Sequence, residues 1–192
     1  MDGVIGVLLA AGAGARFGDG PKVRASLGGR ELWEWPLDAL RRGGAEALVV
    51  VQGAARFEVE GAAVVVCEGW AEGLSASLRV GVEEAARRGA EAVVIALADQ
   101  PLLDARAVAR VLAARGDGAE AVRATYAARP NHPTVIESSL FGAVAALRGD
   151  EGARSLLGGA RLVPCDGLGA PDDVDTPEDL ARVDRVRRLA EG

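Results

Sequence analysis

Residues 4–22 read VIGVLLAAGAGARFGDGPK, a short apolar run that ends in a glycine-rich loop with two cations. The apolar part, residues 4–9, has the length and composition of a strand buried on both faces. Further runs of this kind follow at residues 47–51, 63–66, 92–97 and 121–125. Such strands are typical of a mostly parallel sheet covered by helices on both sides.

Helical periodicity fills the segments between these strands. Apolar residues recur at helical spacing around residues 74–85, 108–112 and 140–147. A last helix is predicted from Thr176 as the cap, Pro177 as the first helical residue and Asp179 as the second half of a capping box. The alternation predicts a single-domain, Rossmann-like, three-layer α/β/α fold over residues 1–192, with ligands bound at the carboxyl ends of the strands.

Composition and charge exclude several classes of function. The net charge of -6 lacks the positive field that sequence-independent binding of nucleic acid or anionic lipid requires. The longest apolar stretch, residues 4–15, is shorter than the about 20 residues of a membrane span, and no basic segment precedes it as in a secretory signal. Cys67 and Cys165 form no C-x-x-C pair. We therefore expect a cytoplasmic protein without nucleic-acid or membrane partners.

Two scarce residue types limit the chemistry of the site. The chain has one histidine, His132, which excludes a metal site built on several histidines and leaves a Ser-His-Asp triad a single base. Among the 22 basic residues, Lys22 is the one lysine. Catalysis must therefore rely on carboxylates, Lys, Arg and the backbone.

The loop after the first strand has the features of a phosphate site. Its small residues let backbone N–H groups approach an anion, and Arg16 and Lys22 supply positive charge. The dinucleotide fingerprint fails because Phe17 stands at its third glycine, and the Walker A pattern fails because Lys22 lies between Pro21 and Val23. The alternative interpretation is a tight glycine-rich turn with two surface cations.

Two acidic segments are candidates for a metal site. Asp99 follows the strand at residues 92–97, so it lies at the edge where the glycine loop is expected, and a carboxylate beside phosphates is typical of Mg²⁺ binding. Asp175 precedes the last helix and is a second candidate ligand. A turn before Pro101 would explain Asp99 without a metal, and helix capping would explain Asp175.

Three polar segments are ambiguous from the residues alone. Ser75 and Ser77 open the predicted helix after the third strand, where they either contact a nucleotide or cap the helix. The stretches 129–133, which contains His132, and 149–154 are predicted to be loops.

Taken together, the motifs LAAGAGARFGDGPK, GLSASLR, ADQPL, NHP, GDEGAR and DVDTPEDL resemble the molybdenum cofactor cytidylyltransferases within the MobA-like NTP transferases. The resemblance spans residues 9–180 and implies the nucleotide-diphospho-sugar transferase type of fold. Two departures are Cys67, where relatives often have Asn, and Arg129-Pro130-Asn131, where relatives have Gly before His-Pro.

The resemblance implies a role for each matching residue. Arg16 and Lys22 would contact the triphosphate, Asp99 and Asp175 would bind Mg²⁺, and the pterin side would involve His132, Asp150 and Arg154. Nucleotide contacts would come from Leu9, Ala10, Ala11, Gly12, Gly14, Ser75 and Ser77. The LAAG sequence and the serines favour CTP. Transient docking to a molybdoenzyme or its chaperone is the implied protein contact.

The implied reaction transfers CMP from CTP to molybdenum-loaded molybdopterin and releases pyrophosphate. The acceptor phosphate is already anionic, so no Ser-His activation is needed, and catalysis reduces to positioning and charge neutralisation. The alternatives are a guanylyltransferase, an NTP transferase acting on another small phosphorylated acceptor, and a nucleotide-binding maturation accessory or reductase on the same scaffold.

Overall fold

The structure, a computed structural model, describes residues 3–18, 20–148 and 156–191. Its centre is a seven-stranded sheet in the order β5-β4-β1-β6-β8-β7-β9. One strand, β8, pairs antiparallel with both of its neighbours, whereas the other paired strands of this sheet are parallel. The prediction of a mostly parallel sheet is confirmed. The strand bounds are β1 (Val4–Ala10), β4 (Ala47–Gln52), β5 (Ala63–Val66), β6 (Ala92–Leu97), β7 (Ala121–Tyr126), β8 (Arg129–Glu137) and β9 (Arg161–Pro164).

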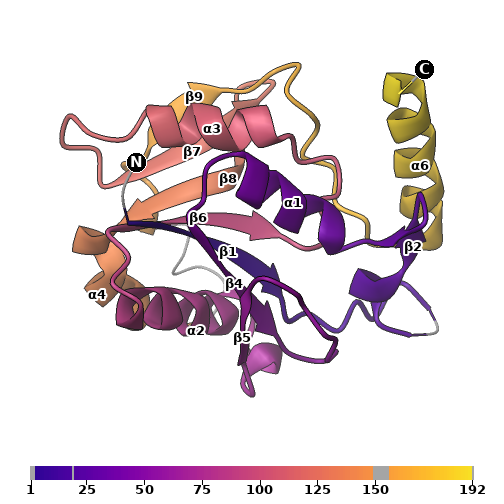
Figure 1. Cartoon of the computed structure of the whole chain (residues 1–192), viewed down its shortest axis with the longest axis horizontal. Helices are drawn as coiled ribbons and strands as arrows, with labels where there is room; N and C mark the ends of the chain where they lie inside the picture. The colour runs from indigo at the N-terminus through magenta and orange to yellow at the C-terminus, as the bar shows by residue number, and fades with distance from the viewer. Residues whose placement is uncertain (1–2, 19, 149–155, 192) are drawn as a thin grey trace.

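Helices cover both faces of the sheet (Figure 1). On one face lie α1 (Glu34–Arg42) and α3 (Ala105–Ala113), and on the other lie α2 (Leu74–Arg87) and α4 (Phe141–Ala145). Alternate residues of β1 supply the two cores, with Leu8 in the first and Val7 and Leu9 in the second. Because both faces are buried, the strand is apolar without interruption. The predicted three layers are confirmed.

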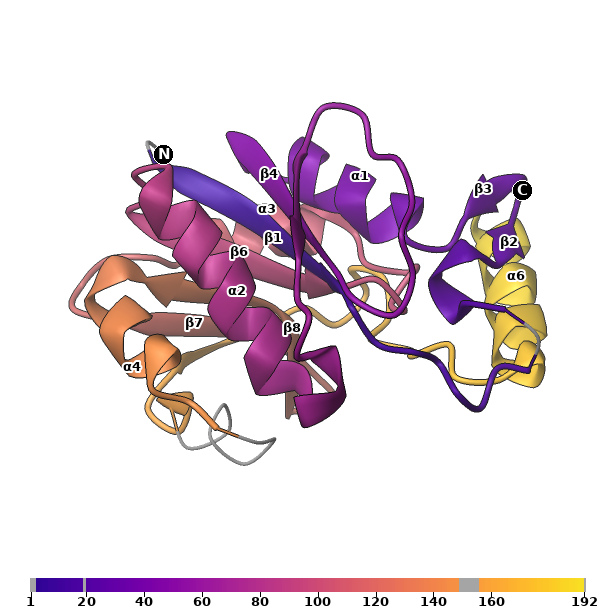
Figure 2. The ribbon, with the colours of Figure 1, turned by 90° about the horizontal axis from the view of Figure 1, so that it is seen from below.

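A small structural unit lies beyond the carboxyl ends of the parallel strands. It contains α6 (Pro177–Glu191) and the two-stranded sheet of β2 (Ser26–Leu27) and β3 (Arg30–Glu31), and it stands beyond the ends of the central strands (Figure 2). Leu27, Leu32, Val174 and Val183 form its core. The predicted capping box is present, because Asp179 N donates to Thr176 Oγ1 at 3.2 Å and Thr176 N donates to Asp179 Oδ2 at 3.0 Å.

The largest departure from the sequence prediction is β8. Residues 129–133 were expected to be a loop, and that expectation is wrong, because the stretch forms the first half of β8. Two prolines make the segment look like a turn, yet Val135 and Ile136 anchor the strand in the core. The ladder with β7 is irregular between Arg123 and Ala124. Pairing with the neighbouring strands has therefore outweighed the tendency of the prolines to form a turn.

Smaller differences concern the length of one helix and two elements that the sequence did not predict. The helix expected around residues 140–147 is limited to α4, which follows a short 3-10 turn, η3 (Ser138–Leu140). The sequence pattern did not predict α1 or β9. Both cysteines are buried free thiols. No helix among the described residues is both long and apolar enough to cross a bilayer.

Candidate active site

The ammonium group of Lys22 joins the two predicted carboxylates. Its Nζ donates to Asp99 Oδ2 at 2.8 Å and to Asp175 Oδ1 at 2.9 Å. The other oxygen of Asp175 accepts a hydrogen bond of 2.8 Å from the Arg16 guanidinium. Residues from three distant segments therefore meet at one place, here called the lysine–carboxylate cluster.

Backbone structure holds this cluster together. Asp99 lies just after β6, and Lys22 begins the 3-10 turn η1 (Lys22–Arg24) after the loop from the neighbouring strand β1. Asp175 comes from the segment before α6, and the adjacent Val174 donates its N–H to the carbonyl oxygen of Asp99 at 2.9 Å. The carboxylates are thus brought together by a main-chain hydrogen bond as well as by their shared cation.

Gly14 allows the glycine loop to fold back onto Lys22. Its φ of +63° is unfavourable for residues with a Cβ. An added Cβ would also lie 2.5 Å from the Cβ of Lys22. The turn is closed by Phe17 N, which donates to the Gly14 carbonyl at 2.9 Å. The glycine at this position is therefore required for the lysine to reach the carboxylates.

Charges in the cluster are balanced before any ligand binds. Burial lowers the pKa of Lys22, whose side chain is 9% exposed, but Asp99 and Asp175 outweigh burial and the pKa is raised above its usual value. The hydrogen bond from Lys22 is the main cause that lowers the pKa of Asp175. The Arg16 side chain is 75% exposed and reaches the cluster from solvent. Lys22 is therefore the buried cation of the cluster and Arg16 the exposed one.

Gln100 is a structural link of this site that the sequence analysis did not single out. It is buried, and its side-chain amide donates to Asn131 Oδ1 at 3.0 Å and to Asp173 Oδ1 at 2.8 Å. Burial raises the pKa of Asp173, the Gln100 hydrogen bond lowers it, and the charges of Asp99 and Asp175 raise it further, so the net pKa is raised. The D-Q-P motif could have indicated this role of Gln100, because a polar side chain beside Asp99 at the end of a buried strand needs hydrogen-bond partners.

A cavity of about 670 Å³ lies beside the cluster, on the α2 face of the sheet. Leu9, Ile95, Ile136 and two leucines of α2 form apolar walls. Its polar lining residues are Arg16, Arg123, His132, Thr134 and Asp173. The cavity therefore combines an apolar interior with polar groups, and Arg16 and Asp173 connect it to the lysine–carboxylate cluster.

The structure locates most of the predicted nucleotide-binding residues around this cavity and loop. Leu9 lines the cavity, the side chains of Ala10 and Ala11 are buried, and the loop becomes exposed at Gly12. Ser75 and Ser77 are both buried, and α2 presents Leu74 and Leu78 to the cavity instead. A contact between these serines and a nucleotide stays a prediction. Asp150 and Arg154 lie outside the described residues.

His132 is an uncharged member of the cavity lining at neutral pH. Burial is the main cause that lowers its pKa to about 4; the charge of Arg123 also lowers it, while the Ile95 carbonyl and Asp99 oppose the shift. Its Nδ1 lies 3.2 Å from the Ile95 carbonyl oxygen. A neutral ring facing a carbonyl carries its proton on that nitrogen, so Nε2 is an acceptor.

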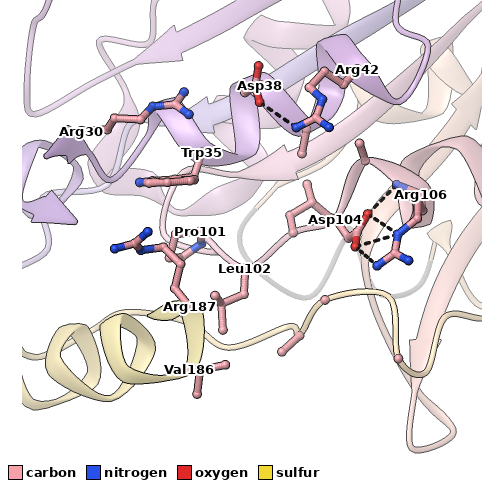
Figure 3. A pocket seen from close by; sticks show the side chains of 16 residues that line it. Arg30, Trp35, Asp38, Arg42, Pro101, Leu102, Asp104, Arg106, Val186 and Arg187 are labelled. Carbon is pink, nitrogen blue, oxygen red and sulfur yellow. Dashed lines mark hydrogen bonds and ion pairs between the residues drawn. The ribbon is translucent and has the colours of Figure 1, made fainter. Parts of the chain in front are cut away.

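A second cavity, of about 650 Å³, lies on the α1 and α3 face (Figure 3). Two of its arginines, Arg30 and Arg187, contact the ring of Trp35. Each of its four arginines forms an ion pair with a carboxylate: Arg30 with Glu34, Arg42 with Asp38, Arg106 with Asp104 and Arg187 with Asp184. The positive charge here is neutralised by the protein itself.

The donor set of the lysine–carboxylate cluster fits a magnesium ion. Asp99 and Asp175 share one ammonium group, so their oxygens lie near each other, and hard carboxylate oxygens are the protein ligands that Mg²⁺ prefers. Two carboxylates leave room for the phosphate oxygens and waters that complete an octahedral shell. The residues present therefore fit the predicted metal.

Comparison with known proteins identifies the family. The model of the MobA-like NTP transferase domain matches residues 6–165. The chain is 36% identical to nicotine blue oxidoreductase of Paenarthrobacter nicotinovorans, over 94% of this chain and 96% of that protein. It is 30% identical to a molybdenum cofactor guanylyltransferase of Cereibacter sphaeroides, over 96% of this chain and 97% of that protein.

Solved structures agree with this assignment. A crystal structure of Rv0371c from Mycobacterium tuberculosis H37Rv superposes with a TM-score of 0.81 at 31% identity, over 95% of this chain and 97% of that chain. A second structure of Rv0371c, a complex with manganese, gives a TM-score of 0.76 at 28% identity, over 95% of this chain and 98% of that chain. This chain belongs to the family of MobA-like NTP transferase domains.

Proposed function

We propose that this protein transfers CMP from CTP to the terminal phosphate of molybdenum-loaded molybdopterin. The observation that carries the proposal is the lysine–carboxylate cluster, which stands between the glycine loop and the cavity on the α2 face. The glycine loop offers backbone N–H groups for a triphosphate, the cluster offers cations and carboxylates, and the cavity offers space for an acceptor. The 30% identity to a molybdenum cofactor guanylyltransferase supports this acceptor class.

In the proposed reaction, an anionic oxygen of the acceptor phosphate attacks the α-phosphorus of CTP. A new P–O bond forms, the bond between the α-phosphorus and the bridging oxygen to the β-phosphate breaks, and pyrophosphate leaves with the electron pair. Lys22 and Arg16 neutralise the charge that develops on the leaving group. To do so, Lys22 exchanges hydrogen bonds with Asp99 and Asp175 for hydrogen bonds with phosphate oxygens, which keeps the buried ammonium paired throughout.

We also propose that Asp99 and Asp175 hold Mg²⁺ when nucleotide is bound. Bound by these carboxylates, a divalent cation would supply Lewis-acid charge that helps to neutralise the phosphates. The manganese complex of Rv0371c supports a divalent-cation site in a relative of this fold. The proposal of CTP rather than GTP is supported by the LAAG sequence of residues 9–12 and by its resemblance to cytidylyl members.

Pyrophosphate release tests the proposal directly. Purified protein is incubated with Mg²⁺ and molybdenum-loaded molybdopterin, and CTP, GTP and ATP are compared. We expect release with CTP and loss of release in Asp99→Asn. Asp117→Asn is the matched control, because Asp117 is exposed and its φ of +50° is tolerated by asparagine. Release with GTP alone would replace the nucleotide assignment, and no release with any nucleotide would reject the transferase proposal for this acceptor.

A second candidate function is reduction of an aromatic heterocycle. The observation that favours it is the 36% identity to nicotine blue oxidoreductase over nearly the whole chain. Oxidation of NADH or NADPH in the presence of a conjugated heterocyclic acceptor tests this function, with pyrophosphate release measured in parallel. Hydride transfer does not require the charge of Asp99 for phosphate chemistry. We therefore expect Asp99→Asn to keep reductase activity if this second function holds, and to lose transfer activity if the first holds.

A further inference from the structure

Arg123 is a half-buried cation of the cavity, and no carboxylate of the described residues neutralises it. It lies in β7, and its side chain lines the cavity on the α2 face. Its Nε is buried and has no hydrogen-bond partner in the described part of the chain. Burial lowers the pKa of this guanidinium, and no carboxylate of the described residues counteracts the shift. A buried polar atom without a partner costs free energy, and a ligand in the cavity could supply the missing hydrogen bond to this Nε.

The second cavity differs from this one in how its arginines are paired with carboxylates. There, all four arginines have carboxylate partners, as Arg42 has Asp38 and Arg106 has Asp104 (Figure 3). The chain contains 28 acidic residues against 22 basic ones, so carboxylates are abundant. Arg123 therefore differs from the four arginines of the second cavity, because no carboxylate of the described residues pairs with it.

The register of the sheet sets the distance between Arg123 and the lysine–carboxylate cluster. Arg123 lies opposite Thr134 of β8, which lies opposite Ile95 of β6. Arg123 is thus two strands across from Ile95, and Asp99 is four residues further along from Ile95. A spacing of about 4.8 Å per strand and a rise of about 3.3 Å per residue separate the backbones of Arg123 and Asp99 by roughly 16 Å. Arg123 therefore enters the cavity from the side away from the lysine–carboxylate cluster.

His132 lines the same cavity and supplies a hydrogen-bond acceptor. Because its neutral ring donates to the Ile95 carbonyl, its Nε2 accepts hydrogen bonds. Arg123 offers only donors. The two residues together present donors and an acceptor above apolar walls, which suits a flat heterocycle that carries both a ring carbonyl and an amino or ring N–H group.

We propose that Arg123 binds the end of the acceptor opposite the reacting phosphate, by donating to the ring carbonyl of a pterin whose N–H groups donate to His132. This inference rests on the proposed function for its acceptor class. It makes Arg123 a specificity-determining residue: it favours long acceptors that end in an oxygen-bearing heterocycle over small phosphorylated sugars or alcohols.

Arg123→Gln tests the inference, with Arg129→Gln as the matched control because Arg129 is an exposed arginine of the adjacent strand. We expect the KM for molybdenum-loaded molybdopterin to rise roughly 10- to 100-fold, as for a lost hydrogen bond from a charged donor. The kcat and the KM for CTP should stay within about twofold, because Arg123 does not contact the nucleotide. Arg123→Lys keeps the charge without the planar fork and should give an intermediate KM.

Stability provides a readout that does not depend on activity. If Arg123 serves a ligand, the ligand-free Arg123→Gln protein should unfold at the same or a higher temperature than the wild type, since a costly buried charge is gone. A drop of several degrees in Tm would assign Arg123 a structural role and overturn the inference.

Binding of a phosphate-free pterin, followed by quenching of its fluorescence, separates the two proposals. Wild-type protein that binds the pterin more tightly than Arg123→Gln but transfers no nucleotide would refute the proposed function and keep this inference. Wild-type protein that transfers CMP, with an acceptor KM unchanged in Arg123→Gln, would refute this inference and keep the proposed function.

Discussion

Acidification should destabilise the protein through its single histidine. In the folded chain the pKa of His132 is lowered from 6.5 to about 4, mainly by burial. Above the unfolded pKa of 6.5 both states hold a neutral ring, so stability is complete there. As the pH falls from that value, the unfolded chain takes up a proton that the folded chain refuses, and stability decreases until the folded pKa is passed.

The size of this effect follows from the shift. Each unit of pKa difference corresponds to about 1.36 kcal/mol, so the full loss is about 3 kcal/mol. At about pH 5 the unfolded histidine is almost fully charged and the folded one almost fully neutral, which gives a loss of about 2 kcal/mol. That is a large part of a typical stability of about 5 to 15 kcal/mol.

Urea unfolding at about pH 7.5 and about pH 5 measures this difference. The chain has one histidine, so few other side chains titrate in that interval. Asp173, with its raised pKa, opposes the trend because it gains a proton more readily in the folded state as the pH falls. His132→Gln should remove most of the pH-dependent loss, whatever its stability at about pH 7.5. A folded-state histidine NMR titration centred near 6.5 would refute the reasoning.

Substitutions at three further positions have defined outcomes. Lys22→Arg should lower pyrophosphate release at least about tenfold, because a planar guanidinium does not fit the compact place between Asp99 and Asp175, and unchanged kinetics would contradict this. Gly14→Ala should destabilise the fold by roughly 1 to 2 kcal/mol in thermal or urea unfolding, through its positive φ and its clash with Lys22; equal stability would place the loop elsewhere. Asp104→Ala should cost about 1 kcal/mol, because Asp104 caps α3, whereas Asp104→Asn should keep the cap. Arg106 hydrogen bonds hold the pKa of Asp104 below 3.8, so the wild-type advantage over Asp104→Asn should fade as the pH falls below about 4, which acid unfolding curves of the pair would test.

The strand-end rule accounts for what the sequence could predict about the site. Lys22 and Asp99 follow neighbouring parallel strands, and the carboxyl ends of such strands meet at one edge. Asp175 was a candidate ligand from its place before the last helix, supported by the resemblance, and a hydrogen bond from Val174 N to the carbonyl oxygen of Asp99 shows how it reaches the site. These positions follow from local patterns combined with one general rule of topology.

The remaining features depend on pairings that no local pattern contains. The prolines on both sides of His132 indicate a turn, and it is the burial of Val135 and Ile136 against the core that makes the segment a strand. Arg123, the one charged residue of β7, was the available signal for the far end of the cavity. That Arg123 belongs to the cavity becomes clear only from the strand register, which places it in line with Thr134 and Ile95.

Because β8 runs antiparallel to its neighbours, two separate parts of the chain contribute residues to the site. The parallel strands β1 and β6 carry the glycine loop and Asp99, while β7 and β8 carry Arg123 and His132. Substitutions in residues 121–137 therefore act on the side of the cavity formed by β7 and β8, and their effects should couple to changes at Leu9 and Arg16, which line the same cavity, but not to changes at the exposed Gly12. Under the proposed function, such a scaffold can exchange one acceptor for another while its nucleotide chemistry stays unchanged.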